Sequence, residues 1–402
     1  MVLPTVSSHE ETPPFSGRRL RVGLLANTFD DVFGAVAGGH VHFIEVAKRW
    51  SDYDLMVFAP ELARDVIARE LPRAVFVPMP SGQRFLRTRV VRNLYRTVAS
   101  VRQRRLLRTC DVVIATSHFL PDIVPACFAG KRSIACVQHL LDPPGKRPGS
   151  FLANTVSTVF QALSVVLIRR FSGALLVNGM DVADRVGFGN GARIYVMTHG
   201  VEHLIDAQRT VAERDVRTVI YLGRLVETKG VDELIKAWAL VLQAVPDARL
   251  VIAGTGPPKF AEGLRKQTEV LGIERSVEFC GFVTEQEKNE RLDQASVFAF
   301  PSKEEGWGIV LAEAMAHGLA CVTYDLPAYR HVFTSGRRWA ALGDVAGFAR
   351  SIVELLTSDG LRSELSAEAL DLSAGFSWER AAAIERRAVE DVAADAARGV
   401  LR

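Results

Sequence analysis

The sequence predicts an α/β protein with two doubly wound parallel sheets. Short β-branched runs alternate with helix-length segments along most of the chain, which is the order that builds parallel sheets flanked by helices. A polar stretch around 202–215 interrupts this alternation once. The chain has 402 residues, 48% of them hydrophobic, so it is long enough for two or three domains and too apolar for general disorder.

The strand predictions follow from short apolar runs bounded by turn residues. Seven such runs fall in the first half, at 20–25, 54–58, 74–77, 112–115, 133–137, 174–177 and 194–197. Five more fall in the second half, at 218–222, 249–252, 277–279, 297–300 and 320–323. The chain after Asp344 is predicted to be helical and to end in a helix over 378–397.

These elements divide the chain into two Rossmann-like domains. We expect a loose leader at 1–17, a first domain at 18–200, a linker at 201–216, a second domain at 217–375 and a terminal helical segment at 376–402. Ligands of doubly wound sheets gather at the carboxyl ends of the strands, so the residues just after each strand are the candidate site residues.

The formal net charge of +3 conceals two halves of opposite sign. Residues 1–200 hold 25 Lys and Arg against 15 Asp and Glu, whereas 201–402 hold 24 against 31. Residues 84–108 contain nine arginines and no acid: Arg84, Arg87, Arg89, Arg92, Arg96, Arg102, Arg104, Arg105 and Arg108. The basic character therefore belongs to one segment of the first half.

That segment has the pattern of an amphipathic helix. Apolar side chains recur at helical spacing, at Val90, Leu94, Val98 and Val101. Arg89, Arg92 and Arg96 follow another face, as in a helix lying on an anionic membrane. The alternative is a solvated helix that covers the sheet. Nucleic-acid binding is disfavoured because the interleaved aromatics are limited to Phe85 and Tyr95.

Cysteine usage and hydropathy predict a cytoplasmic chain. The five cysteines are odd in number and form no C-x-x-C pair, so we expect buried thiols in a reducing compartment. Residues 1–17 lack the basic start and apolar core of a signal peptide. The most apolar stretch, 162–168, is shorter than the roughly 20 residues that span a bilayer, so no transmembrane helix is expected.

The first motif that carries chemistry is Pro-Ser-Lys-Glu-Glu-Gly-Trp-Gly at 301–308, between a buried strand and a short helix. Free N–H groups at that helix start form an anion site. Glu305 precedes the helix, and Glu313 lies within it among apolar neighbours, so its carboxylate needs partners. Sugar hydroxyls are suitable donors to both acids. Alternatively, Glu305 caps the helix and Glu313 makes an internal ion pair.

The second motif is Gly-Arg-Leu-Val-Glu-Thr-Lys-Gly at 223–230, on a strand-to-helix loop. Arg224 and Lys229 can converge there on a diphosphate, because Arg binds phosphate bidentately and Lys adds a point charge. Such a pair would stabilise a leaving nucleotide without metal. The alternative is that both are ordinary solvated loop charges.

Together these motifs resemble the retaining GT-B glycosyltransferases of family 4, the glycosyl transferases group 1. Glu305 and Glu313 match that family's E-x7-E pattern, after Gly-Arg-Leu and Lys-Gly. Segments 253–257, 281–283 and 376–379 agree as well. The resemblance is strong over 218–385 and weaker over 20–200, where Gly38-Gly39 opens a helix and Gln138-His139 ends a strand.

The resemblance implies a GT-B fold, in which two domains face a cleft and the last helix crosses back to the first domain. It implies transfer of a hexosyl-type sugar from a nucleoside-diphosphate sugar to an acceptor hydroxyl, with no metal or other cofactor. The first domain would take the acceptor and the second the nucleotide sugar. We expect a glycan or lipid-linked acceptor, a peripheral position on the inner face of an anionic membrane through 84–108, and no nucleic-acid partner.

The resemblance also implies roles for individual residues. Arg224 and Lys229 would hold the donor diphosphate, Glu305 the sugar hydroxyls and Glu313 the ribose hydroxyls, while His139 would face the sugar from the first domain. His139, Glu305, Arg224 and Lys229 form the catalytic set. The other donor-binding positions are Gly38, Gly39, Gly254, Phe282, Val283, Gly306, Trp307, Gly308 and Ile309.

The sequence departs from the family pattern at three places. The family's His-Asp is His-Leu-Leu-Asp at 139–142, which leaves an acidic partner for His139 open. The common Asn-Gly-Val-Asp is His-Gly-Val-Glu at 199–202, and Trp307 stands where Phe is common. A lone histidine at a strand end is more often structural, and Gly38-Gly39 also suits a plain tight turn.

Two rival functions on the same fold are a sugar-nucleotide epimerase, which needs no acceptor, and a degenerate subunit that binds without turnover. A nicotinamide dehydrogenase is disfavoured because residues 34–39 are not a G-x-G-x-x-G fingerprint. Gly-Thr-Gly at 254–256 runs into Pro257-Pro258, which predicts no clean start for a pyrophosphate-binding helix.

Overall fold

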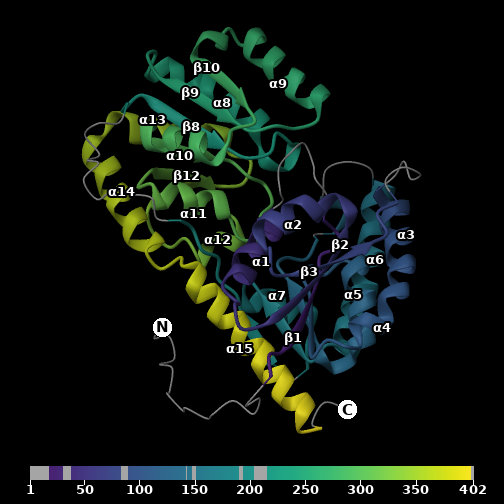
Figure 1. Cartoon of the computed structure of the whole chain (residues 1–402). Helices are drawn as coiled ribbons and strands as arrows, with labels where there is room; N and C mark the ends of the chain where they lie inside the picture. The colour runs from purple at the N-terminus through teal and green to yellow at the C-terminus, as the bar shows by residue number, and fades with distance from the viewer. Residues whose placement is uncertain are drawn as a thin grey trace.

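The computed structural model describes residues 18–29, 38–82, 89–141, 143–146, 151–189, 193–202 and 215–399. Within them the chain forms two parallel sheets, one in each lobe of the molecule (Figure 1). The expected leader, Gly34–Ala37, Arg84, Arg87, Asp142 and most of the expected linker lie outside the described residues.

The first sheet has seven parallel strands in the order β3-β2-β1-β4-β5-β6-β7. These are β1 (Arg21–Leu25), β2 (Asp54–Pro60), β3 (Val75–Met79), β4 (Val112–Ala115), β5 (Ser133–Val137), β6 (Ala174–Val177) and β7 (Arg193–Val196). The strand order reverses beside β1, which makes the carboxyl ends of β1 and β4 the switch point where doubly wound sheets bind ligands.

The second sheet has six parallel strands in the order β10-β9-β8-β11-β12-β13. These are β8 (Thr218–Leu222), β9 (Arg249–Ala253), β10 (Val277–Gly281), β11 (Val297–Phe300), β12 (Ala320–Tyr324) and β13 (Arg337–Ala340). The sequence predicted all of them except β13. Its Arg-Arg-Trp-Ala sequence has no β-branched run, and it becomes a strand by pairing with β12 at the edge of the sheet.

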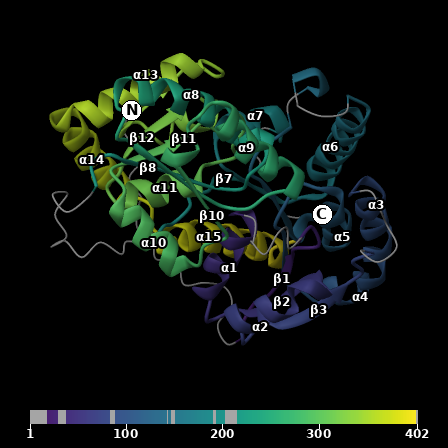
Figure 2. The same ribbon diagram turned by 90° about the horizontal axis from the view of Figure 1, so that it is seen from above.

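Helices cover both sheets (Figures 1 and 2). Those of the first lobe are α1 (Gly38–Lys48), α2 (Arg64–Glu70), α3 (Arg89–Ala99), α4 (Arg104–Leu107), α5 (Leu120–Ala126), α6 (Phe151–Phe171) and α7 (Met180–Val186). Those that follow are α8 (Val231–Ala244), α9 (Pro258–Val270), α10 (Glu285–Gln294), α11 (Ile309–Ala316), α12 (Pro327–Arg330), α13 (Val345–Thr357), α14 (Asp359–Ser373) and α15 (Trp378–Ala397).

The last helix, α15, crosses back to the first lobe, as predicted (Figure 1, yellow). Its buried face, which includes Trp378 and Val389, belongs to the same apolar cluster as the strands of the first sheet. Arg193 Nε donates to Asp395 Oδ2 at 2.7 Å, and the buried His42 of α1 pairs with Glu385. Both parallel sheets and the crossing helix confirm the predicted GT-B fold class.

The predicted membrane contact of Arg96 in α3 was wrong, and the Arg89 side chain lies outside the described residues. Arg96 is fully buried and donates to the main-chain carbonyls of Ser81 and Asn27, at 3.1 and 3.2 Å, and Arg92 is half-buried. The exposed face of α3 is apolar instead: Val91, Leu94, Tyr95 and Val98. An arginine can satisfy its donors inside the fold by binding carbonyls, so a two-face charge pattern did not fix which face points outward.

The stretch 162–168 lies within α6, whose 21 residues are long and apolar enough to cross a membrane by length and composition alone. The apolar segment is therefore longer than the sequence analysis expected. A further expectation, at α9, was wrong. Pro257-Pro258 does start a helix, α9, because proline at the first position loses no helical hydrogen bond.

All five cysteines are free thiols, as expected from their spacing. Cys110, Cys136 and Cys321 are buried, whereas Cys127 and Cys280 are half-buried. Burial raises the pKa of the Cys110 and Cys127 thiols to about 11. These thiols are therefore weak nucleophiles at neutral pH.

Candidate functional site

Three loops of the second sheet meet at the carboxyl ends of β8, β9 and β11. We call residues 223–230, 254–256 and 301–308 the convergent loops. The Lys303 N–H donates to Thr228 O at 2.8 Å, and the Leu225 N–H donates to Thr255 O at 2.8 Å. Main-chain hydrogen bonds therefore fix the two predicted motifs against each other, although 70 residues (231–300) lie between them in the sequence.

Glycines make this approach possible. A Cβ on Gly230, whose φ is +67°, would lie 2.0 Å from Pro301 O. A Cβ on Gly254, whose φ is +144°, would lie 1.8 Å from Gly223 O. Both distances are far below van der Waals contact, so each position demands glycine on conformation and on space.

Lys229 and Glu305, one from each motif, form an ion pair inside the convergent loops. Lys229 Nζ lies 2.5 Å from Glu305 Oε1, and the two side chains are only 13% and 12% exposed. Lys229 Nζ also donates to Glu304 O at 3.4 Å. Arg224 is exposed on the same loop. The structure thus brings together the cation predicted for the diphosphate and the acid predicted for the sugar.

Glu313 of α11 also has a lysine partner. Lys288 of α10 places its Nζ 2.8 Å from Glu313 Oε1 and 2.5 Å from Glu285 Oε2. Burial raises the pKa of the Glu313 carboxyl, while the Lys288 ammonium lowers it. The internal ion pair considered as the alternative for Glu313 is therefore present, and so the carboxylate has a fixed partner next to its predicted ribose contact.

His139 reaches the convergent loops from the first lobe. A Cβ on Gly306 would lie 3.2 Å from His139 Nδ1 and 3.6 Å from Asn178 Nδ2, so Gly306 packs directly against both side chains. Burial lowers the pKa of His139 although the Glu304 and Glu305 carboxylates raise it. A Cβ on Gly39 would lie 2.9 Å from Gln138 Oε1, which places the start of α1 beside the same strand end.

Asn178 and His199 lie beside the convergent loops, and the sequence analysis did not predict either as a site residue. Asn178 Nδ2–H donates to Gly306 O at 2.9 Å, and Asn178 Oδ1 lies 3.3 Å from His199 Nε2. Asn178 directly follows β6, so its strand-end position is the signal that could have singled it out. The hydrogen bond to Gly306 joins the two lobes.

The Trp307 ring lies between the lobes and not in an open pocket. It is 4% exposed and packs on the rings of His199, Phe333 and Phe376, with centroid separations of 4.6–5.3 Å. Only the Trp307 backbone remains for a ligand. Gly308, with φ +112°, turns the chain into α11, where Ile309 is the first residue.

The remaining predicted donor-binding positions differ in exposure. Phe282 is 56% exposed, which leaves its ring available at the end of β10. Val283, the next residue, packs against the core of the second lobe. An exposed aromatic ring beside a partly buried valine suits one wall of a base-binding site.

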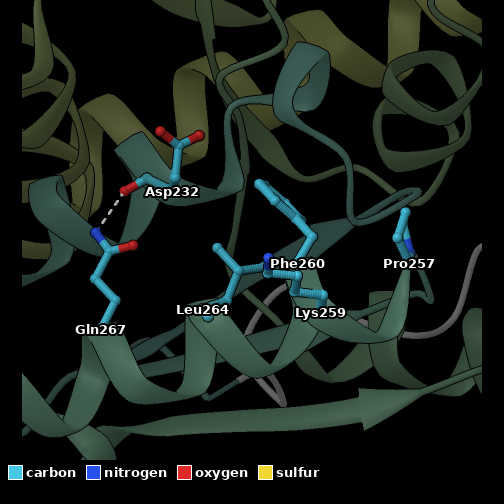
Figure 3. Close-up of a pocket in the computed structure, with 7 residues that line it drawn as sticks. Asp232, Pro257, Lys259, Phe260, Leu264 and Gln267 are labelled. Carbon is cyan, nitrogen blue, oxygen red and sulfur yellow. Dashed lines mark hydrogen bonds between the residues drawn. The ribbon is translucent and has the colours of Figure 1, made fainter. Parts of the chain in front are cut away.

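A hollow of about 430 Å³ lies between α8 and α9, beside the convergent loops. Figure 3 shows Phe260 and Leu264 of α9 forming its floor, while the Gln267 side chain donates to Asp232 O at 2.9 Å. It is lined by Asp232, Pro257, Lys259, Phe260, Gly263, Leu264 and Gln267. None of these is a predicted site residue, so this hollow is separate from the predicted donor site.

Comparison with known proteins agrees with the fold and the motifs. Residues 205–371 match the family Glycosyl transferases group 1. A phosphatidyl-myo-inositol mannosyltransferase of Mycobacterium leprae is 34% identical over 181 residues, 44% of this chain and 47% of that protein. The homologous protein of Mycobacterium tuberculosis is 30% identical over 255 residues, 60% of this chain and 65% of that protein. The first match therefore spans about half the relative's length.

Solved structures extend the likeness to nearly the whole fold. HepE of Anabaena, crystallised with UDP and glucose, superposes with a TM-score of 0.71 at 16% identity, covering 94% of this chain and all of that one. At this identity the likeness shows the fold alone. Residues 205–371, which include the E-x7-E pattern and the loop of Arg224 and Lys229, are thus similar to the glycosyl transferases group 1.

Proposed function

We propose that this protein is a retaining glycosyltransferase that moves a hexosyl-type sugar from a nucleoside-diphosphate sugar to an acceptor hydroxyl. The observation that carries the proposal is the Lys229–Glu305 ion pair, which lies next to the Gly306 contact with His139. A cation for phosphate and an acid for sugar hydroxyls are thus adjacent in the second lobe, and a histidine faces them from the first.

In this mechanism the second lobe binds the donor. Arg224 and Lys229 stabilise the negative charge that develops on the departing diphosphate, which is where electrostatic stabilisation accelerates transfer most. Glu305 exchanges part of its contact with Lys229 for hydroxyls of the sugar. The acceptor hydroxyl attacks the face that the nucleotide leaves, and the departing phosphate helps to take its proton.

A thermal-shift panel of nucleoside diphosphates and sugar nucleotides tests donor binding. A ligand at a hundred times its dissociation constant adds about 2.7 kcal/mol to the free energy of unfolding, so a true donor raises the melting temperature by several degrees. Incubating the selected donor without acceptor then separates transfer from the epimerase alternative, which yields an isomer. Binding without any turnover would favour the non-catalytic alternative.

Asn178→Ala is expected to lower kcat about fivefold to tenfold while the affinity for the nucleoside diphosphate stays within twofold. The reason is that the lost hydrogen bond to Gly306, worth about 1 kcal/mol, aligns the two lobes and lies outside the predicted nucleotide contacts. Steady-state kinetics and calorimetric titration of the nucleotide measure the two effects. Asn154→Ala on α6 is the control, and an unchanged kcat in Asn178→Ala would remove Asn178 from the site.

We further propose that the acceptor is lipid-linked and that the first lobe docks on an anionic membrane. The mycobacterial relatives named for phosphatidyl-myo-inositol support a lipid acceptor. Helices α3 and α6 both pack on α5 and lie on the same side of the lobe (Figures 1 and 2). Each of them carries large exposed apolar side chains. On α6 these are Phe151, Leu152, Val159, Leu163 and Val166.

Exposed arginines accompany these apolar faces. Arg102, Arg104, Arg105 and Arg108 follow α3 directly and are exposed. An apolar helix face with neighbouring cations is the combination that binds anionic bilayers, at about 1 kcal/mol for each basic residue near the surface. The buried Arg96 takes no part in this contact.

Liposome sedimentation tests the membrane proposal. The pair Leu94→Glu and Val98→Glu on α3, and the pair Leu163→Glu and Val166→Glu on α6, are each expected to reduce binding to anionic vesicles at least tenfold. Leu240→Glu and Val270→Glu, at exposed sites of the second lobe, are the matched control and should bind like the parent. A parent protein that stays in the supernatant would refute the membrane proposal and leave the transferase proposal standing.

A further inference from the structure

Lys288 is a largely buried lysine beside the predicted ribose-binding acid. Its side chain is only 12% exposed, and its ammonium contacts Glu313 Oε1 and Glu285 Oε2. Glu285 is 85% exposed and Glu313 is 23% exposed, so the Glu313 contact is the inner one. The mechanism proposed above does not use Lys288.

The local structure explains why this lysine points inward. A capping box, in which Thr284 and Glu287 exchange side-chain and main-chain hydrogen bonds, fixes the start of α10. Lys288 then lies one turn before Leu292, the buried residue of this polar helix. Positions i and i+4 share one helix face, so Lys288 occupies an inward position where an apolar residue packs most favourably.

A lysine at such a position has a cost that a leucine lacks. Burying an ammonium is unfavourable unless it is paired, and an ion pair in a partly buried place gains little over an apolar side chain of similar volume. The pairing therefore needs a reason beyond stability. Glu313 supplies such a reason. Its Oε1 accepts a hydrogen bond from Lys288, and within the described residues no hydrogen bond to its Oε2 is found.

We propose that Lys288 is a positioning residue of the donor site, which holds Glu313 as an ionised carboxylate with Oε2 free for the ribose hydroxyls of the nucleotide. This inference rests on the proposed function, because it takes the ribose contact of Glu313 from it. A carboxylate accepts two hydroxyl hydrogen bonds, whereas a protonated carboxyl uses one oxygen as a donor and accepts them poorly.

The charges around Glu313 come from two helices. Lys288 and Glu285 act on it from α10, and His317 acts on it from its own helix. His317 Nδ1 lies 2.7 Å from Asp293 Oδ1. The helix α14 packs along α11, but its Arg362 pairs with Asp359 and its Glu368 accepts the Gly336 N–H.

The sign of the pH effect follows from these groups. Burial already raises the pKa of Glu313, and removing the Lys288 cation raises it further. The carboxylate is lost as the pH falls through that pKa. A variant without the cation therefore loses nucleotide affinity at a higher pH than the parent does, and it recovers the affinity when the pH is raised.

Calorimetric titration of the nucleoside diphosphate selected by the thermal-shift panel tests this at pH 6 and pH 8. Each variant is compared with the parent at the same pH, because this comparison cancels the titration of the ligand's own phosphate. Lys288→Met is expected to bind the nucleotide about tenfold more weakly than the parent at pH 6, and with an affinity within threefold of the parent at pH 8. Lys288→Arg should stay within threefold at both. Lys266→Met, which removes an exposed lysine of α9, is the charge-matched control.

The outcomes are distinguishable. Equal loss of nucleotide affinity at both pH values in Lys288→Met, or no loss at either, overturns the inference about Lys288. If Glu313→Gln still weakens nucleotide binding in that case, the proposed ribose contact of Glu313 stands. Unchanged binding in Glu313→Gln overturns the ribose contact and this inference together. A melting curve for each variant shows that the folded protein is titrated.

Discussion

Replacing Lys229 by methionine is expected to lower the rate of sugar transfer about 100- to 1,000-fold. In the proposed mechanism the ammonium stabilises the charge that develops on the departing diphosphate, and removing one group of that kind from a preorganised site costs this much. The change also leaves Glu305, 12% exposed, without its cation, so we expect the free energy of unfolding to fall by about 3 kcal/mol. An activity assay and a thermal melt measure the two effects.

The double variant separates catalysis from stability. Lys229→Met combined with Glu305→Gln removes both charges, so most of the lost stability should return while the transfer rate stays at least as low as in the single variant. Lys236→Met, at an exposed position on the neighbouring helix α8, is the control for loss of a positive charge. If the single variant at Lys229 kept more than a tenth of the parental rate, this residue would have no catalytic role.

Gly254→Ala is expected to destabilise the second lobe by about 3 kcal/mol or more. The new Cβ would lie 1.8 Å from Gly223 O, and alanine rarely adopts the φ of +144° found there. The collision would push apart the loops that carry Arg224 and Thr255. Chemical denaturation of the purified variant gives the change in the free energy of unfolding.

Gly263→Ala is the matched control for this prediction. Gly263 lies inside α9, and nothing lies within 4 Å of a Cβ built on it. Alanine in a helix interior gains about 0.5–1 kcal/mol over glycine, so this variant should be more stable than the parent. Equal stability of both variants would mean that the loops at Gly223 and Gly254 can move apart without cost.

Most of the fold followed from the sequence because each strand of the two sheets is a short apolar run with clear ends. Strands such as Val112–Ala115 and Val297–Phe300 are buried along their whole length. A short continuous apolar run of that kind, bounded by turn residues, is typical of a buried parallel strand. The edge strand Arg337–Ala340 was missed, since its pairing with β12 outweighs its composition.

The candidate site residues that lie together in one short motif could be predicted from the sequence. Glu305, Lys229 and Arg224 stand in motifs directly after strands, and the structure brings those motifs together. Asn178 and Lys288 contact residues that are far away in the sequence, Gly306 at 128 residues and Glu313 at 25. No local pattern marks such contacts, because they depend on how the lobes and helices pack.

The α3 helix shows a limit of periodicity as a guide to orientation. Its arginines and its apolar residues were assigned to two separate faces, but periodicity does not say which face meets the sheet. The structure buries Arg96 on main-chain carbonyls and exposes Leu94 and Val98. The membrane proposal therefore rests on exposed apolar side chains and on the arginines after α3.

The most direct test of the central claim is proton NMR of the sugar released from the donor. The protein is incubated with the α-linked sugar nucleotide that the thermal-shift panel selects, with water as the acceptor, and the anomeric protons are followed before mutarotation equilibrates them. The account predicts that the α-anomer forms first, together with the nucleoside diphosphate. First formation of the β-anomer, or no release from a donor that binds, would contradict it.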